Sequence, residues 1–279
     1  MIRIVTDSSC DLPDEILDRH RITLVPLTIR FGDESFVDRE ELSIDNFWGR
    51  LGAAKDLPET AAPSVGRFQD AYRALSDAGA DGIVAVMISA GISATHQSAS
   101  LASEQLRSGI PVRVVDSGLV SAALGLGVLA AARAAEAGGT IDDVEATARD
   151  AVASSNLFAA LDTLEYLKRG GRIGSAAAFF GNLLDVKPLI TFADGVVSAG
   201  GRVRTRRKAI KAVLDHLESL ESVAEVGVVH SNPPDLDEFL SALKERGHED
   251  PLVARLGPVV GTHAGPGVIG IVYRLSESD

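Results

Sequence analysis

An unbroken apolar run that leads through a loop of small residues into a helix constrains the fold of this chain most. The run covers residues 82–88, and the loop Ser89-Ala-Gly-Ile-Ser93 follows it. A short apolar run without alternation predicts a buried strand. The spacing after the loop predicts a helix from about Ala94 to Arg107, with Ser93 as N-cap.

The same loop is a candidate ligand site. A strand that turns through a glycine into a helix directs backbone N–H groups into the crevice at the carboxyl end of the sheet, where open α/β sheets bind ligands. A helix N-terminus favours an anion there. Ser93, Thr95 and Gln97 suit a carboxylate or phosphate rather than a metal. The alternative is a capped helix that binds nothing.

Repeated units set the fold class. Strand–helix repeats through residue 150 predict an α/β fold, with a mostly parallel sheet and helices on both faces. From residue 154 onward, hairpins are mixed with helices, which predicts a second, α+β domain. We therefore expect an N-terminal domain over residues 1–153 and a C-terminal domain over residues 154–279. Thr23 to Ile29 is predicted as one strand, and Ser175 to Leu184 as one helix.

Composition removes several classes of function. The 279-residue chain has a net charge of −12, which argues against nucleic-acid or anionic-membrane partners attracted by bulk electrostatics. The one cysteine, Cys10, excludes a disulfide framework and a cysteine-based metal site. No signal segment and no apolar run of membrane-spanning length occur. We expect a cytoplasmic protein without an integral membrane segment.

Two features outside the central loop invite a catalytic or cofactor interpretation. Asp7-Ser-Ser9 directly follows the first strand, where Asp7 could act in catalysis or could cap the loop, and we expect Asp7 and Ser8 to line a site. Gly125 and Gly127 resemble part of a dinucleotide fingerprint. They lie about two turns inside a predicted helix, however, so close helix packing explains them better.

Basic residues gather in the second half, against the acidic background. Arg172 and the cluster at residues 202–208 each adjoin a glycine-rich turn, and such a rim suits a phosphate or an acidic surface. His263 lies in Gly261-Thr-His-Ala-Gly-Pro-Gly267, which predicts a tight backbone turn that aims the imidazole into a cleft.

Several motifs, in this order, resemble those of the DegV family over essentially the whole chain. They are Val5-Thr-Asp-Ser-Ser-Cys-Asp-Leu-Pro13, Thr60-Ala-Ala-Pro-Ser64, Ile88-Ser-Ala-Gly-Ile-Ser-Ala-Thr-His-Gln-Ser-Ala99, Val115-Asp-Ser117, Leu164-Glu-Tyr-Leu-Lys-Arg-Gly-Gly-Arg-Ile173, Lys187-Pro188, Arg204-Thr-Arg206 and His263-Ala-Gly-Pro-Gly267. The family includes the fatty-acid-binding subunits of the bacterial fatty acid kinase, FakB. Its members resemble two-domain α/β proteins with one buried acyl chain.

The resemblance implies a role for each matching residue. Thr60, Ser93, Ala94 and His263 would bind the carboxylate of a long-chain fatty acid. Arg172, with Arg204 or Arg206, would lie around the head group and engage the kinase. Phe179, Phe180, Leu183 and Leu184 are candidates for the lining of the acyl tunnel, although an ordinary core would explain them equally well. The chain would itself need no cofactor or metal.

The family pattern also has departures here. Two of those motifs contain residues that the family does not commonly have there, namely Ala61 and Ala62 in the first and Ala90, Ile92 and Ala94 in the second. These replacements are expected to affect ligand preference more than carboxylate binding. The resemblance implies a substrate-binding subunit of phospholipid metabolism, with phosphoryl transfer performed by a partner kinase. The alternatives are a small-molecule hydrolase or phosphotransferase that uses Asp7, Ser93 and His263, and a lipid carrier or sensor without a kinase.

Overall fold

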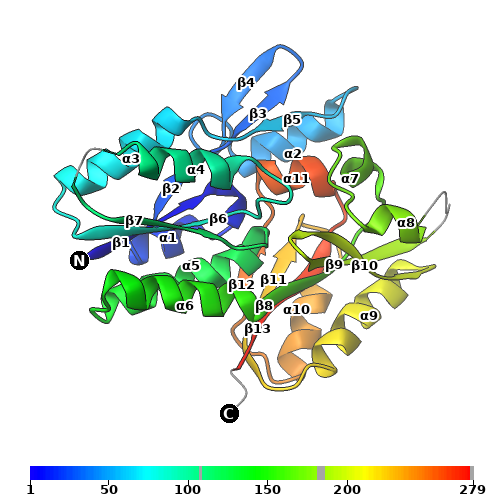
Figure 1. Cartoon of the computed structure of the whole chain (residues 1–279). Coiled ribbons are helices and arrows are strands. Elements are labelled where there is room, and N and C mark those ends of the chain that lie inside the picture. The colour runs from blue at the N-terminus through cyan, green and yellow to red at the C-terminus, as the bar shows by residue number, and fades with distance from the viewer. Residues whose placement is uncertain (107–108, 181–185, 277–279) are drawn as a thin grey trace.

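A computed structural model describes residues 1–106, 109–180 and 186–276. Its first layer is a four-stranded sheet in the order β2-β1-β6-β7, in which every neighbouring pair is parallel (Figure 1). The strands are β1 (Ile2–Asp7), β2 (Thr23–Val25), β6 (Gly82–Met87) and β7 (Val112–Asp116). All six residues of β6 are buried, as the apolar run predicts.

Helices cover both faces of this sheet (Figure 1). On one face lie α3 (Val65–Asp77) and α4 (Thr95–Glu104), and on the other lie α5 (Ser121–Glu136) and α6 (Ile141–Ala153). Ser64 caps α3, and Thr140 and Asp143 form a capping box at the start of α6. The predicted fold class is therefore confirmed for the first half of the chain.

The second sheet has six strands in the order β10-β9-β8-β13-β11-β12, and only β11 and β12 pair in parallel. They are β8 (Ser155–Ala160), β9 (Lys187–Ala193), β10 (Val196–Val203), β11 (Val223–His230), β12 (Leu252–Arg255) and β13 (Ile269–Leu275). One face packs on α9 (Arg206–Glu218) and α10 (Leu236–Glu245). Because α5 contacts β8, β11 and β13 as well as β1 and β6, it lies between the two sheets.

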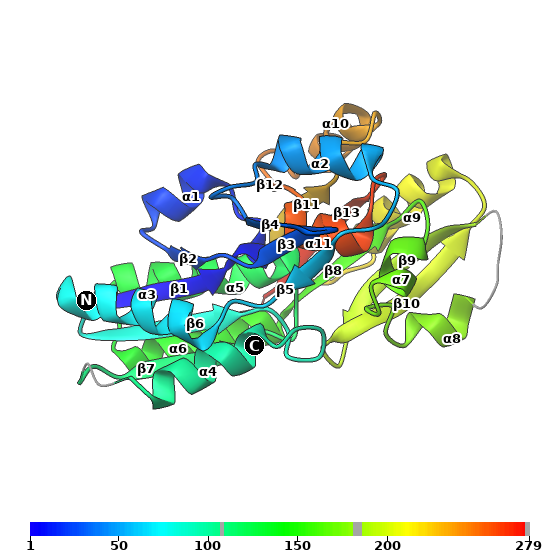
Figure 2. The same ribbon diagram turned by 90° about the horizontal axis from the view of Figure 1, so that it is seen from above.

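A small antiparallel sheet in the order β4-β3-β5 lies beside these layers, next to α2 and α11 (Figures 1 and 2). The remaining elements complete the chain. They are β3 (Thr28–Phe31), β4 (Glu34–Val37), β5 (Glu59–Ala61), the 3-10 helix η1 (Ser8–Cys10), α1 (Asp14–Arg19), α2 (Ile44–Ala53), α7 (Glu165–Arg169), α8 (Ala176–Phe180) and α11 (Pro258–Ala264).

The two glycines inside α5 serve close packing. A Cβ on Gly125 would lie 2.8 Å from Leu12 Cδ2, and one on Gly127 would lie 2.3 Å from Val152 Cγ1. The helix can therefore approach the segment after β1 and helix α6 only because these side chains are missing. This confirms the packing interpretation and excludes the fingerprint interpretation.

Two strand predictions were wrong in the first half. The predicted strand from Thr23 to Ile29 is two strands, β2 and β3, which belong to different sheets. Pro26 lies between them, and a proline has no N–H to continue the ladder. β4 was not predicted, because its sequence, Glu34-Ser-Phe-Val37, carries no apolar alternation. Gly32, with φ of 58°, lies in the turn that connects β3 and β4.

Three helix predictions also differ from the structure. α4 begins at Thr95, after Ala94 in the N-cap position, and ends at Glu104 rather than near Arg107. α8 covers Ala176–Phe180, Ser175 lies in the turn before it, and residues 181–184 of the predicted helix lie outside the described residues. His263 lies on the helix α11 rather than in a tight turn. Gly261 suggested a loop, but a Cβ there would lie 2.6 Å from Phe47 Cε1, so this glycine lets α11 pack against α2.

The change of sheet type falls where the sequence pattern changes. All strands of the parallel sheet precede residue 117, and all strands of the six-stranded sheet follow residue 154. The division into residues 1–153 and 154–279 remains a proposal, because one apolar core runs through both halves. Over the ranges described, no helix combines the length and apolar character needed to cross a bilayer.

Candidate functional site

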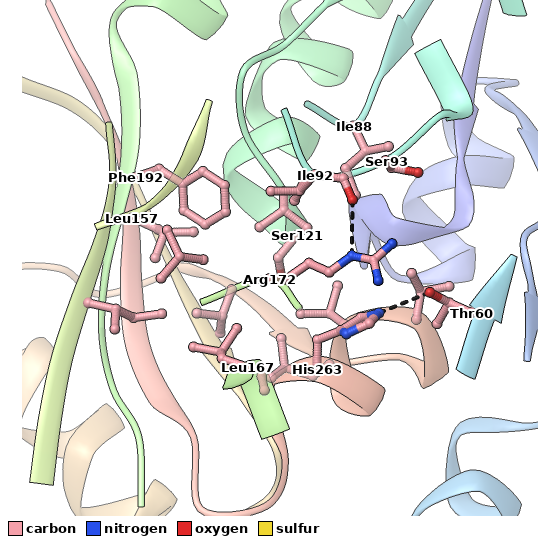
Figure 3. A pocket seen from close by; sticks show the side chains of 18 of the residues that line it. Thr60, Ile88, Ile92, Ser93, Ser121, Leu157, Leu167, Arg172, Phe192 and His263 are labelled. Atoms are coloured by element: carbon pink, nitrogen blue, oxygen red, sulfur yellow. Dashed lines mark hydrogen bonds between the residues drawn. The ribbon is translucent and has the colours of Figure 1, made fainter. Parts of the chain in front are cut away.

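A cavity lies between the two halves of the chain and is lined by residues from both (Figure 3). The space between its walls is about 1000 Å³, open solvent included. Five lining residues are polar: Thr60, Ser93, Ser121, Arg172 and His263. The apolar lining residues are Leu27, Ala62, Ile88, Ile92, Ala94, Val120, Leu157, Ala159, Leu161, Leu167, Ile190, Phe192, Val197, Val229, Leu256, Val259, Val260, Ala264 and Val268.

Four of the five polar lining residues gather at one end of this cavity. Figure 3 shows Thr60, Ser93, Arg172 and His263 on one side, and Leu157 with Phe192 on the opposite side. Each polar residue comes from a different part of the chain, namely β5, the loop before α4, the loop after α7, and α11. The fold therefore assembles one polar end and one apolar end from distant segments.

Thr60 and His263 are in direct contact at the polar end. Thr60 Oγ1 and His263 Nε2 lie 2.9 Å apart, within hydrogen-bond distance. Burial, and secondly the positive charge of Arg172, lower the pKa of His263 to about 4. The imidazole is therefore neutral near pH 7 and carries one N–H.

The other ring nitrogen of His263 identifies the position of that proton. Nδ1 is buried without a hydrogen-bond partner among the described residues, and a Cβ on Gly170 would lie 2.3 Å from it. A proton on Nδ1 would be an unsatisfied buried donor facing the Gly170 backbone. We therefore assign the proton to Nε2, which donates to Thr60 Oγ1 and leaves the Thr60 hydroxyl hydrogen available to a ligand.

Ser93 and Arg172 complete the polar end. The Ser93 hydroxyl lies 2.8 Å from Thr95 Oγ1 and accepts a hydrogen bond from Thr95 N, and Ala94 lines the cavity beside it. Arg172 Nε donates to Ile92 O at 3.2 Å, and its Nη1 donates to Gly170 O at 2.7 Å. The guanidinium is thereby fixed at the cavity by two backbone carbonyls, and its positive charge favours an anion nearby.

The apolar end is built from alternate residues of strands. Leu157, Ala159 and Leu161 follow one another at every second position, as do Ile190 and Phe192. Phe158 and Ala160 lie on the opposite face of β8 and pack in the core with α9 and α10. The sequence did not identify these lining residues. Their period of two was visible, but it does not say which face of the sheet lines a cavity.

The structure brings most of the predicted site residues together. Thr60, Ser93, Ala94, Arg172 and His263 all line the one cavity. The two remaining arginines lie elsewhere. Arg204 is exposed between β10 and α9, whereas Arg206 forms a bidentate ion pair with Asp235 and also donates to Gly267 O. Arg206 therefore fixes the loop that follows α11.

Of the four residues expected in the tunnel lining, only Phe179 has a described side chain, and it does not line the cavity. Phe179 lies at the surface with half of its side chain exposed, and the Arg202 guanidinium lies 5.6 Å from its ring centre. Leu183 and Leu184 lie outside the described residues, as does the side chain of Phe180. The lining observed comes instead mainly from strands β8 and β9, the ends of β6 and β12, and helix α11.

Asp7 and Ser8 do not line the cavity, which corrects our expectation. Asp7 is fully buried, and its carboxylate accepts hydrogen bonds from Ser9 N, Ser9 Oγ and Ile88 N. Burial raises the pKa of Asp7. This residue fixes the backbone around the loop, so it does not form a catalytic set with Ser93 and His263. Across the described ranges, no group of three or more His, Cys, Asp or Glu residues could hold a metal ion.

A second hollow shares three polar residues with the cavity. Thr60, Arg172 and His263 contribute to both, and the second hollow is otherwise lined by Leu57, Pro58, Glu59, Arg169, Gly170 and Thr262. Charged side chains from Glu59 and Arg169 form part of its wall. The polar end therefore borders the apolar cavity and also a more polar recess.

Comparison with protein families and curated proteins gives a consistent result. The family model described as an uncharacterised protein of the DegV family matches residues 1–275. A DegV domain-containing protein of Streptomyces coelicolor is 39% identical over 276 residues, which cover 97% of each chain.

Solved structures with the same fold include proteins that bind fatty acids. A fatty-acid-binding DegV family protein of Thermus thermophilus superposes with a TM-score of 0.90 at 32% identity, covering 99% of each chain. A stearic-acid-binding protein of Eubacterium ventriosum has a TM-score of 0.88 at 29% identity, covering 98% of each chain.

Proposed function

Because the chain belongs to the DegV family, we propose that it binds one long-chain fatty acid in the cavity. The carboxylate would lie at the polar end, beside Thr60, Ser93 and His263, and the acyl chain would lie along the apolar walls. One observation carries this proposal: a cavity with apolar walls has four of its five polar lining residues at a single end. The fatty-acid-binding relatives of Thermus thermophilus and Eubacterium ventriosum support it.

The chemistry of the polar end fits a carboxylate. A buried carboxylate is unfavourable unless donors reach its oxygens. The Thr60 hydroxyl can donate, because Nε2–H of His263 donates to its oxygen. The Ser93 hydroxyl is a second donor, and Arg172 provides positive charge at the cavity wall. These groups can balance one negative charge without a metal ion.

The apolar end fits a saturated or unsaturated hydrocarbon chain. Burial contributes about 0.8 kcal/mol per methylene, so ten methylenes would contribute roughly 8 kcal/mol before ordering costs. The lining residues carry no charge at this end, and Thr60, Ser93, Arg172 and His263 lie away from Leu157 and Phe192. The acyl chain would therefore supply most of the binding free energy.

We further propose that the chain presents the carboxylate to a separate kinase, as a FakB-like subunit, and has no catalytic group of its own. A carboxylate oxygen would attack the terminal phosphorus of a nucleoside triphosphate held by the kinase, forming an acyl phosphate and releasing the nucleoside diphosphate. The recess that shares Thr60, Arg172 and His263 with the cavity supports this, because it offers access to the polar end. Arg172 and the exposed Arg204 would face the partner.

Native mass spectrometry tests the binding proposal. The purified protein should carry one fatty acid, identified after organic extraction, and a Ser93→Ala/His263→Ala double variant should lose it. An empty protein that also takes up no added stearate would contradict the proposal. Acyl phosphate formed with a fatty acid kinase catalytic subunit and ATP would support presentation. A loaded protein that the kinase never phosphorylates would identify a carrier or sensor instead.

A further inference from the structure

The buried segment from Asp7 to Asp11 has no role in the function proposed so far, although it contacts the cavity wall from behind. Leu27 N donates to Ser8 Oγ at 3.1 Å, and Ile88 N donates to Asp7 Oδ2 at 2.8 Å. Leu27 and Ile88 both line the cavity. The segment therefore holds separate parts of the wall through its side chains.

Asp11 makes the contacts that reach furthest along the chain. Its Oδ2 accepts from Ser121 Oγ at 2.5 Å, and its Oδ1 accepts from Gly257 N at 2.9 Å. Ser121 is the first residue of α5 and lines the cavity. Gly257 is the N-cap of α11, the helix that carries His263. One carboxylate thus joins the N-termini of two helices that form the cavity.

The backbone around this carboxylate is unusual. Asp11 has φ of 52° and Ser121 has φ of 57°, which is the left-handed region that non-glycine residues rarely adopt. Both residues are 2% exposed. Strained backbone at two residues joined by a hydrogen bond persists only where surrounding contacts enforce it, and it is often found at functional sites.

Asp11 and Arg206 hold the two ends of the same helix. Arg206 donates to Gly267 O, just after α11, while Asp11 accepts from Gly257 N, just before it. Gly265, with φ of 72°, ends the helix against the Tyr166 ring, where a Cβ would lie 2.3 Å from Cδ2. His263 is therefore set by fixed points on both sides of a seven-residue helix.

We propose that Asp11 is a positioning residue of the carboxylate site, which holds α11, and with it His263, in register with the wall formed by α5. Only the expected effect of Asp11 on fatty-acid binding rests on the proposed function. The position of the His263 ring depends on Asp11 whether or not a ligand is present.

The charged and titratable groups near Asp11 are Arg39, Asp38 and Cys10. Arg39 donates to Leu12 O and pairs with Asp14. Asp38 is fully buried, and Ser8 and Arg39, neither of which belongs to α5 or α11, stabilise its carboxylate. Asp38 is therefore a matched control, since it is an equally buried acid of the same cluster without a tie to α11.

The test compares Asp11→Ala, Asp11→Asn and Asp38→Ala in the full-length protein. One readout is the ring resonances of His263 in ligand-free protein by NMR, assigned with a His263→Gln variant. The other is the dissociation constant for stearate. Asparagine can still accept from Gly257 N and can donate to Ser121 Oγ, so Asp11→Asn should retain the position of His263.

We expect Asp11→Ala to shift the His263 ring resonances and to weaken stearate binding about tenfold more than Asp38→Ala does, with Asp11→Asn close to wild type. Equal effects of Asp11→Ala and Asp38→Ala, or unchanged His263 resonances in Asp11→Ala, would overturn the proposal. If Asp11→Ala does not fold, Ser121→Ala, which removes one of the two hydrogen bonds, must shift the same resonances. Wild-type protein that fails to bind stearate would contradict the proposed function, while the resonances would still decide the role of Asp11.

Discussion

The two ends of the cavity are built in different ways. At the polar end, single residues from four separate segments converge, and each depends on a specific hydrogen bond, such as the one between Thr60 and His263. At the apolar end, alternate residues of neighbouring strands form a continuous wall, as Leu157 and Ala159 do. Binding at the polar end therefore depends on the exact positions of a few atoms. Binding at the apolar end depends on the cavity volume and on the apolar area that is buried.

This difference separates two measurable quantities. In a series of fatty acids, the gain in binding free energy per added methylene reports the apolar end. The part that is common to all chain lengths reports the polar end. Variants at the apolar end should therefore change the dependence on chain length, and variants at the polar end should weaken all chains by the same factor.

The largest effect is expected from filling the apolar end. Leu157→Trp adds volume at the side of the cavity opposite Thr60 and His263 and should displace two or three methylenes (Figure 3). At about 0.8 kcal/mol each, stearate should bind about 30-fold more weakly. Decanoate, whose tail is shorter, should be affected much less, and it is the internal control. Equal weakening of both acids, by titration calorimetry, would contradict the division of roles.

A smaller and uniform effect is expected from Thr60→Val. The substitution keeps the shape of the side chain and removes the hydroxyl donor, so every chain length should bind about tenfold more weakly. The freed Nε2–H of His263 can still reach toward the carboxylate, which limits the loss. Thr191→Val is the control, because Thr191 lies between the lining residues Ile190 and Phe192 and is not itself in the lining. A loss that grows with chain length would contradict the assignment.

Gly170→Ala should displace the His263 ring. The backbone of Gly170, with φ of −74°, accepts alanine, but the new Cβ would lie 2.3 Å from Nδ1. We expect the distance to Thr60 to lengthen and affinity to fall about fivefold for every chain length. Gly49→Ala is a suitable control, because a Cβ there meets nothing within 4 Å. An unchanged affinity in Gly170→Ala would mean that the His263 position is not needed.

The smallest effect concerns acid stability without ligand. The folded-state pKa of His263, about 4, is below its unfolded value of about 6.5. The unfolded chain therefore binds the proton first, and stability present above pH ~6.5 is lost as the pH falls toward 4. Between pH 6.5 and 4, the free energy of unfolding, measured with urea, should fall by on the order of 1–2 kcal/mol more in wild type than in His263→Gln. Parallel losses in the two proteins would show that His263 is not buried in its neutral form.

The polar end could be predicted from the sequence better than the apolar end. Thr60, Ser93, Arg172 and His263 each belong to a short motif that resembles a motif of the DegV family. Leu157 and Ile190 belong to no such motif, because any strand that is buried on both faces contains residues like them. The helices and strands that pack against each face of the sheet decide which face lines a cavity.

The fold could be predicted where local signals were strong. The buried strand β6 and the alternation of strands and helices in the first half gave correct predictions, because each signal lies within one element or its direct neighbours in the sequence. The helix around His263 was missed because Gly261 and Gly265 favour a loop when read locally. The contacts of α11 with Phe47 and Tyr166, which justify those glycines, come from distant parts of the chain.

The most direct test of the account is a crystal structure of the protein with stearate. We predict electron density for one extended acyl chain along Leu157 and Phe192, with its carboxylate within hydrogen-bond distance of Thr60 Oγ1 and Ser93 Oγ. A carboxylate at the opposite end, or stearate bound outside this cavity, would contradict the central claim that the polar end holds the head group.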